Sequence, residues 1–135
     1  NRFVAGFIGS PKMNFLQATL RPGRDGTAQI ALGDTVLPLP HLPWRGEADC
    51  SFGIRPEHLR LGGGGTRLGE ARVQLVEQLG GSSLIYGTLA DGQPITAQLE
   101  GQQRPRPGES VPLHLDLSLT HLFRPDGEQM VPRSP

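Results

Sequence analysis

The stretch Val111-Pro-Leu-His-Leu-Asp-Leu-Ser-Leu119 places an apolar side chain at every second position. A period of two is that of a β-strand with one face in the core and the other in water. Pro112 lies near the start of this run, where its missing N–H weakens the ladder of hydrogen bonds least. The pattern predicts a strand over residues 111–119, and we expect residues 120–123 to form one helical turn after it.

A second long strand is expected over residues 71–79. Its apolar alternation begins regularly, and Val76 and Leu79 then shift the phase. Such a shift indicates a bulge or bend in a long, curved strand. Residues 84–89 and 95–99 are predicted to follow as shorter strands, joined by a hairpin turn of the Asp-Gly type.

The first half of the chain predicts shorter elements. Strands are expected over residues 13–20, 28–32, 35–39 and 51–55. Residues 38–44 (Pro-Leu-Pro-His-Leu-Pro-Trp) predict an extended connection, because a central strand tolerates proline poorly. The four glycines at 62–65 predict a flexible linker between two lobes, about residues 13–61 and 68–130, with residues 131–135 as a tail.

Composition favours the same class of fold. The chain has 135 residues, of which 19 are glycine and 13 are proline, and this abundance favours short elements and tight turns over a helical bundle. Short strands with glycine at the bends fit a small, partly open barrel of the OB type. We therefore predict an all-β fold, an OB-like barrel of short antiparallel strands in two lobes.

The first residues carry a different pattern. Their apolar side chains recur with the spacing of one helix face: Phe3, Val4, Phe7 and Ile8. Ser10-Pro11 prevents such a helix from continuing, and a helix this short is marginal in water without a packing partner. Since no Met precedes Asn1, we expect a piece of a longer protein, with residues 1–12 a short helix and linker at the junction with a missing domain.

Charge and hydropathy exclude several classes of partner. Lys and Arg number 13, Asp and Glu number 13, and the formal net charge is zero. A balanced chain lacks the basic surface that nucleic acid or an anionic membrane attracts, so we expect neither as a partner. No apolar run approaches the roughly 20 residues that cross a bilayer. The single Cys50 allows no internal disulfide, which suits a reducing cytosol.

The residues that usually carry chemistry do not form recognisable motifs. A phosphate-binding Walker A loop needs Gly-Lys-Ser/Thr, but the chain's lysine, Lys12, stands between Pro11 and Met13. The four histidines do not have the spacing of a metal site (His41, His58, His114 and His121). We therefore predict no catalytic, cofactor-binding or metal-binding residues in this chain.

Four segments, in order, carry a family resemblance: Arg2–Leu16 (RFVAGFIGSPKMNFL), Gly53–His58 (GIRPEH), Val76–Gly80 (VEQLG) and His121–Gly127 (HLFRPDG). Together they resemble the C-terminal regulatory domain, of TOBE or OB-like type, of the ATPase subunit of carbohydrate ABC importers. Maltose and glycerol-3-phosphate importers are the best-known members. The resemblance covers nearly the whole chain and implies a regulatory region built from OB-like β modules.

The resemblance also implies a function for the parent protein. ATP and Mg would bind in the missing catalytic domain, and this chain alone would not be an enzyme. Its implied role is to mediate contacts between two ATPase subunits and with a regulatory protein. The implied partners are a second copy of the subunit, the membrane subunits of the transporter and a possible regulatory protein, at the cytoplasmic face of the inner membrane.

Candidate contact residues lie around Arg55-Pro-Glu-His58, where a rigid proline holds charged groups at the end of a predicted strand. One interpretation is a surface ion pair between Arg55 and Glu57, which contributes little to stability. The other is a contact surface for a second copy or a regulatory protein, and the resemblance favours it. The residues proposed for this surface are Arg2, Phe15, Gly53, Arg55, Glu57 and His58.

A small-ligand module is the alternative function. Related OB-like domains bind oxyanions such as molybdate or sulfate. Arg55, Arg72 or the backbone N–H groups at Gly80-Gly81 are the candidate anion donors. A nucleic-acid-binding OB protein is a third hypothesis, which the zero net charge disfavours.

Overall fold

The computed structural model describes residues 12–101 and 104–131. The predicted helix before Lys12, the candidate residue Arg2 and the tail after residue 131 lie outside the described residues. The described chain forms strands β1 (Asn14–Pro22), β2 (Thr27–Leu32), β3 (Thr35–Pro43), β4 (Ala48–Ile54), β5 (Arg60–Leu61), β6 (Thr66–Gln78), β7 (Ser82–Leu89), β8 (Pro94–Glu100), β9 (Ser110–Leu115), β10 (His121–Phe123) and β11 (Gln129–Val131). Two short 3₁₀ turns, η1 (Pro56–His58) and η2 (Leu117–Leu119), connect them.

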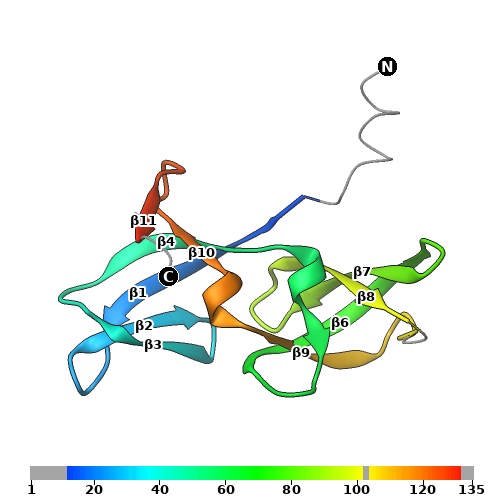
Figure 1. Ribbon diagram of the computed structural model, residues 1–135, viewed down its shortest axis with the longest axis horizontal. Helices are drawn as coiled ribbons and strands as arrows, with labels where there is room; N and C mark the ends of the chain where they lie inside the picture. Colours follow the sequence, from blue (N-terminus) through cyan, green and yellow to red (C-terminus); the bar gives the residue numbers. More distant parts are fainter. Residues whose placement is uncertain (1–11, 102–103, 132–135) are drawn as a thin grey trace.

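The strands form two curled antiparallel sheets, which lie side by side in Figure 1. The first sheet has the strand order β11-β10-β4-β1-β2-β3, and the second has the order β5-β9-β6-β7-β8. The prediction of an all-β, OB-like fold is confirmed.

The chain passes between the two sheets more than once. It leaves the first sheet after β4, and β5 already belongs to the second sheet, before the glycines at 62–65. After β9 it returns, and β10 pairs with β4 at the edge of the first sheet. Each sheet therefore contains strands that are distant in sequence.

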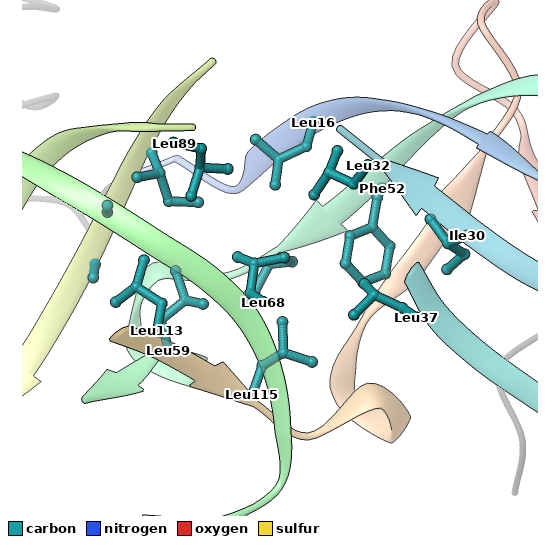
Figure 2. Close-up of a cluster of buried hydrophobic side chains, with 14 of the residues drawn as sticks. Leu16, Ile30, Leu32, Leu37, Phe52, Leu59, Leu68, Leu89, Leu113 and Leu115 are labelled. Carbon is teal, nitrogen blue, oxygen red and sulfur yellow. The ribbon is translucent and has the colours of Figure 1, made fainter. Parts of the chain in front are cut away.

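One hydrophobic core joins the sheets. Phe52, Leu16 and Leu37 of the first sheet and Leu113 and Leu115 of the second belong to a single cluster of buried side chains. Figure 2 shows Leu68 between the leucines of the two halves. Because the cluster is continuous, neither sheet can be separated without exposing apolar surface of the other.

The strand predicted over residues 111–119 is shorter than expected. β9 ends at Leu115, and Leu117–Leu119 form the turn η2. The physical cause is Asp116, whose Oδ1 accepts hydrogen bonds from the backbone N–H of Ser118 at 2.9 Å and from its hydroxyl at 2.7 Å. Such a local bond competes with the strand ladder and turns the chain.

The prediction of a helical turn over residues 120–123 is also wrong. The turn comes earlier, at η2, and β10 (His121–Phe123) is extended. β10 pairs with β4, where His121 lies opposite Gly53 and Phe123 opposite Ser51. Pairing with β4 fixes these residues as a strand whatever their local preference.

The proline-rich connection predicted over residues 38–44 is mostly strand. β3 continues to Pro43, with a register irregularity where Thr27 pairs with Pro43. β3 is the outer strand of its sheet, so one of its sides has no ladder and can accommodate residues that lack an N–H. Proline therefore marks this strand as an edge and does not end it.

The bulge predicted within residues 71–79 is confirmed. The register between β6 and β7 shifts between Val73 and Leu75. Val73 is 1% exposed on one side of the bulge, and Leu75 is 53% exposed on the other. The extra residue turns the outer half of β6, so that its second leucine faces solvent.

Tyr86 on β7 provides a spectroscopic probe of this outer half, because it is the chain's single tyrosine. Burial, the hydrogen bond that its hydroxyl donates to Glu77 Oε1 at 2.8 Å and the charge of Glu77 all raise the pKa of Tyr86. We expect its phenolate to appear at higher pH in the folded chain than in the urea-unfolded chain, as measured by ultraviolet absorbance. Stability from this phenol is present below about pH 10 and is lost as the pH rises through the folded pKa.

The control is Glu77→Gln, which removes the charge and keeps an acceptor for the phenol. The difference between folded and unfolded titration midpoints should shrink in this variant. Equal midpoints in the unsubstituted chain would contradict the hydrogen bond to Glu77.

Cys50 on β4 is a buried thiol with 1% exposure. Burial and the neighbouring charge of Asp49 raise the pKa of Cys50 to about 11. Since the thiolate is the reactive form, we expect a thiol reagent at about pH 8 to modify the folded chain far more slowly than the unfolded chain. A disulfide-exchange assay with and without denaturant measures this ratio, and equal rates would show that β4 is accessible.

Within the residues that the structure describes, no helix has the length and apolar character needed to cross a membrane.

Candidate functional site

Phe15 and Gly53 lie directly opposite each other on the neighbouring strands β1 and β4. β10 adds two rings beside them: the Phe15 and Phe123 ring centroids are 5.6 Å apart at 65°, and those of His121 and Phe123 are 6.0 Å apart at 28°. The Phe15 side chain is 56% exposed. We call Met13, Phe15, His121 and Phe123 the aromatic patch, an apolar surface on one face of the first sheet.

Gly53 is the floor of the aromatic patch. A Cβ at this position would lie 2.8 Å from Met13 Sδ and 2.9 Å from Phe123 Cε2, both closer than Cβ contacts normally come. The absence of a side chain therefore lets the Phe123 ring lie against the sheet. Gly53 contributes by its size and not by any chemistry of its own.

The charged candidates lie just beyond the end of β4. Pro56 begins the turn η1, and the backbone N–H of His58 donates to the Arg55 carbonyl at 3.0 Å. The side chains of Arg55 and Glu57 are exposed, and His58 is half-buried. The structure thus places Phe15 and Gly53 together in the sheet, with the other three on the connection that follows.

The ion pair between Arg55 and Glu57 is not formed. Among the described residues, the side-chain ion pair is instead that of Arg67 with Glu70, at 3.3 Å on the surface of β6. A rigid turn that holds Arg55 and Glu57 apart leaves both charges available to solvent or to a partner.

Sequence reasoning missed Asn14, which joins the two sheets. Its Nδ2 donates to the Ile54 carbonyl at 3.1 Å and to the Thr96 carbonyl at 2.8 Å, and its Oδ1 accepts from the Thr96 N–H at 2.8 Å. The buried amide thereby imitates a backbone partner for the edge of β8. The sequence did carry a signal for this role: every second residue of a strand lies on the same face, so Asn14 shares the inward face of β1 with Leu16 and Leu20.

Gln93 makes a second amide bridge of the same kind. The Gln17 N–H donates to Gln93 Oε1 at 2.6 Å, and Gln93 Nε2 donates to the Gln17 carbonyl at 3.0 Å. Asp91 holds the Gln93 amide in place by accepting from the same Nε2 at 2.7 Å. The entrance of the chain into β1 is therefore tied to the second sheet at two points.

The candidate anion donors lie on three separate elements. Arg55 precedes η1, Arg72 is in the middle of β6, and Gly80-Gly81 are at the tip of the β6–β7 hairpin. Two cavities among the described residues are lined by other side chains and measure about 10 and about 40 Å³, space for a water molecule or two. The described part of the chain contains no group of three or more His, Cys, Asp or Glu residues that could hold a metal ion.

Comparison with family models identifies two regions. The TOBE domain matches residues 52–123, and the MalK OB fold domain matches residues 9–59. Together they span residues 9–123, which include all of Gly53–His58 and Val76–Gly80 and part of the first and last of the four segments recognised from the sequence.

Several curated proteins resemble this chain over nearly its full length. An sn-glycerol-3-phosphate import ATP-binding protein, UgpC of Cupriavidus metallidurans, is 35% identical over 90% of the chain and 34% of its own length. The alpha-glucoside transport ATP-binding protein AglK of Rhizobium meliloti is 37% identical over 95% of the chain and 36% of its own length. The lactose transport ATP-binding protein LacK of Rhizobium radiobacter is 36% identical over 96% of the chain and 38% of its own length. The chain thus spans about a third of the length of these relatives.

Among solved structures, the cytoplasmic molybdate-binding protein ModG with molybdate bound superimposes with a TM-score of 0.60. The match covers 83% of this chain and 96% of that one, at 20% sequence identity. Identity this low supports the shared fold alone. The TOBE model, by contrast, matches more than half of the sequence, and this match shows that the chain belongs to the TOBE domain family.

Proposed function

We propose that this chain is the C-terminal accessory domain of the ATP-binding subunit of a sugar ABC importer, and that it acts by contact and not by catalysis. The observation that carries the proposal is the alignment of at least 90% of the chain with the import and transport ATP-binding proteins UgpC, AglK and LacK. The sugar itself is selected elsewhere in the transporter.

The mechanism we propose is mechanical. Two ATP-binding subunits open and close while their accessory domains keep them together. A regulatory protein that binds one of these states more tightly shifts the equilibrium by the difference between its two affinities. ATP and Mg bind in the part of the subunit that precedes this domain, and the membrane subunits place the assembly at the cytoplasmic face of the inner membrane.

The surface proposed for these contacts is the aromatic patch, together with the charged side chains on the connection that follows β4. Exposed aromatic rings flanked by charged groups are the usual composition of a protein interface, where rings provide buried area and charges provide selectivity. Phe15 and Phe123 supply the rings, and Arg55, Glu57 and His58, on the connection after β4, supply the polar groups. Gly53, which has no side chain, leaves room for the Phe123 ring beside β4.

The gene tests the identity of the parent protein. Reading the coding sequence upstream of Asn1 should give a Walker A motif, an ABC signature motif and a Walker B motif in the same reading frame. A frame without all three would contradict the proposal, whatever the chain itself binds.

The contact surface is tested in the assembled importer, reconstituted in vesicles. Phe15→Ser combined with Phe123→Ser should change the sugar-stimulated rate of ATP hydrolysis several-fold, while ATP binding to the subunit stays unchanged. Val36→Ser is the matched control, because Val36 is also exposed (43%) but lies on β3, away from the patch. Equal rates in the double variant and the control would refute the patch as a contact surface.

A further inference from the structure

Among the residues that the structure describes, no strand pairs with one side of the outer half of β6. β9 pairs with β6 only as far as the Arg72–Ser110 pair, whereas β7 pairs with it as far as Gln78. The last contact on the β9 side is made by Val73, which bonds to Glu109 and Gly108. Beyond Val73, no described residue pairs with that side of β6. In Figure 1 the β6–β7 hairpin extends to the far end of the second sheet.

The ladder to β7 identifies which groups point outward. The Leu79 N–H donates to the Ser82 carbonyl at 2.8 Å, which closes the hairpin. Since alternate residues of an antiparallel strand bond to the same neighbour, Glu77 bonds to β7 as Leu79 does. Val76 and Gln78 therefore direct their N–H and C=O groups to the open side.

The other outer strands are protected by devices that prevent edge pairing. β3 contains Pro38, Pro40 and Pro43, and β5 and β11 have only two and three residues. β8 begins with Pro94, and the backbone N–H and carbonyl of Thr96 are already hydrogen-bonded to the Asn14 side chain. The outer half of β6 has none of these features.

The side chains on this edge also favour association. Leu75 is 53% exposed and Leu79 is 48% exposed. Between residues 73 and 86 the single charged side chain is Glu77, and it is hydrogen-bonded to the Tyr86 hydroxyl. A nearly uncharged edge with exposed leucines does not repel an identical edge.

We propose that the outer half of β6, residues 74–79, pairs antiparallel with the same segment of a second copy of this chain. An antiparallel edge is complementary to itself under a two-fold axis. With Val76 opposite Val76 of the second copy, Leu75 lies opposite Glu77 of the second copy, so no like charges face each other. The segment is short, so the contact is weak and is strengthened when other parts of two subunits are already held together.

This inference rests on the proposed function in one respect: the proposed function explains why two copies of this chain come together. It names a surface separate from the aromatic patch, on the other sheet. If the edge does not pair, the patch and the subunit assignment are unaffected, because they are tested by the upstream gene and by ATP hydrolysis.

Sedimentation equilibrium of the chain, from about 10 μM to about 1 mM, tests the pairing. We expect a monomer–dimer equilibrium and at least a tenfold lower association constant for Leu75→Lys. Val36→Lys, a similar change at an exposed residue of β3, should leave the constant unchanged. A monomer at every concentration, or a dimer that Leu75→Lys leaves intact, would overturn the proposal.

Cross-linking tests the register. Cα atoms of directly opposed residues lie about 5.5 Å apart, within the range that a disulfide spans. Val76→Cys should therefore form a disulfide-linked dimer under mild oxidation, and the buried Cys50 should not interfere. Val36→Cys is the control, because it measures cross-linking by random collision. If Val76→Cys gives no more dimer than this control, a two-fold axis at Val76 is refuted.

Discussion

Replacing Phe52 with alanine is expected to lower the free energy of unfolding by about 3–5 kcal/mol. Phe52 is fully buried, and Figure 2 shows its ring between Leu37 of β3 and Leu32 of β2. Truncation removes the apolar contacts of the ring and leaves a cavity that neighbouring strands cannot close. Urea unfolding followed by circular dichroism measures the loss.

The matched control for this prediction is Phe15→Ala, which removes the same ring from the surface of β1. Because Phe15 is 56% exposed, its loss should lower the free energy of unfolding by less than about 1 kcal/mol. Comparable losses in the two variants would mean that the core does not extend through Phe52 as described.

Asn14→Ala is expected to lower the free energy of unfolding by about 2–3 kcal/mol, much more than its small size suggests. The substitution leaves the Thr96 N–H and the carbonyls of Thr96 and Ile54 without their amide partner. A buried polar group without a partner is destabilising by about 1–3 kcal/mol. The same urea experiment measures it.

Gln17→Ala is the control, since the Gln17 side chain is exposed and donates only to the Ser51 hydroxyl at 3.2 Å. Its backbone still binds Gln93, so we expect a change of a few tenths of a kcal/mol. If Asn14→Ala is equally mild, water replaces the amide and the bridge between the sheets is not important for stability.

The regular part of the fold was predictable because alternation is a local property. The bulge in β6 followed from a change of phase at Val76, and the strands β2 and β3 followed from the short runs predicted over residues 28–32 and 35–39. These features depend on residues within one or two strands, which the sequence displays directly.

The predictions of secondary structure were wrong where a single hydrogen bond, or pairing with a strand distant in sequence, determines the conformation of the backbone. Leu117 and Leu119 continue the alternation of β9, but Asp116 caps a turn through Ser118 and ends the strand. The Asp-x-Ser pattern was the available signal, since such side chains often bond to the backbone two residues ahead. β10 is a strand because β4 lies beside it, which no local pattern reports.

The candidate site was predictable only in part. Phe15 and Gly53 were selected from the sequence, and β1 and β4 do place them opposite each other. Their role in contacts remains a proposal. The ring of Phe123 reaches them only through the return of the chain to the first sheet, and the Asn14 bridge depends on β8, far away in sequence.

That return has a consequence for synthesis on the ribosome. β4 gains its neighbour β10 only when residues 121–123 have left the exit tunnel, although β1 to β4 emerge much earlier. Until then Phe52 has no β10 beside it, and the edge of β4 is open to other nascent chains. The edge of β4 in the newly made domain therefore stays open until residues 121–123 emerge from the ribosome, and a chaperone that shields β4 would act during that interval.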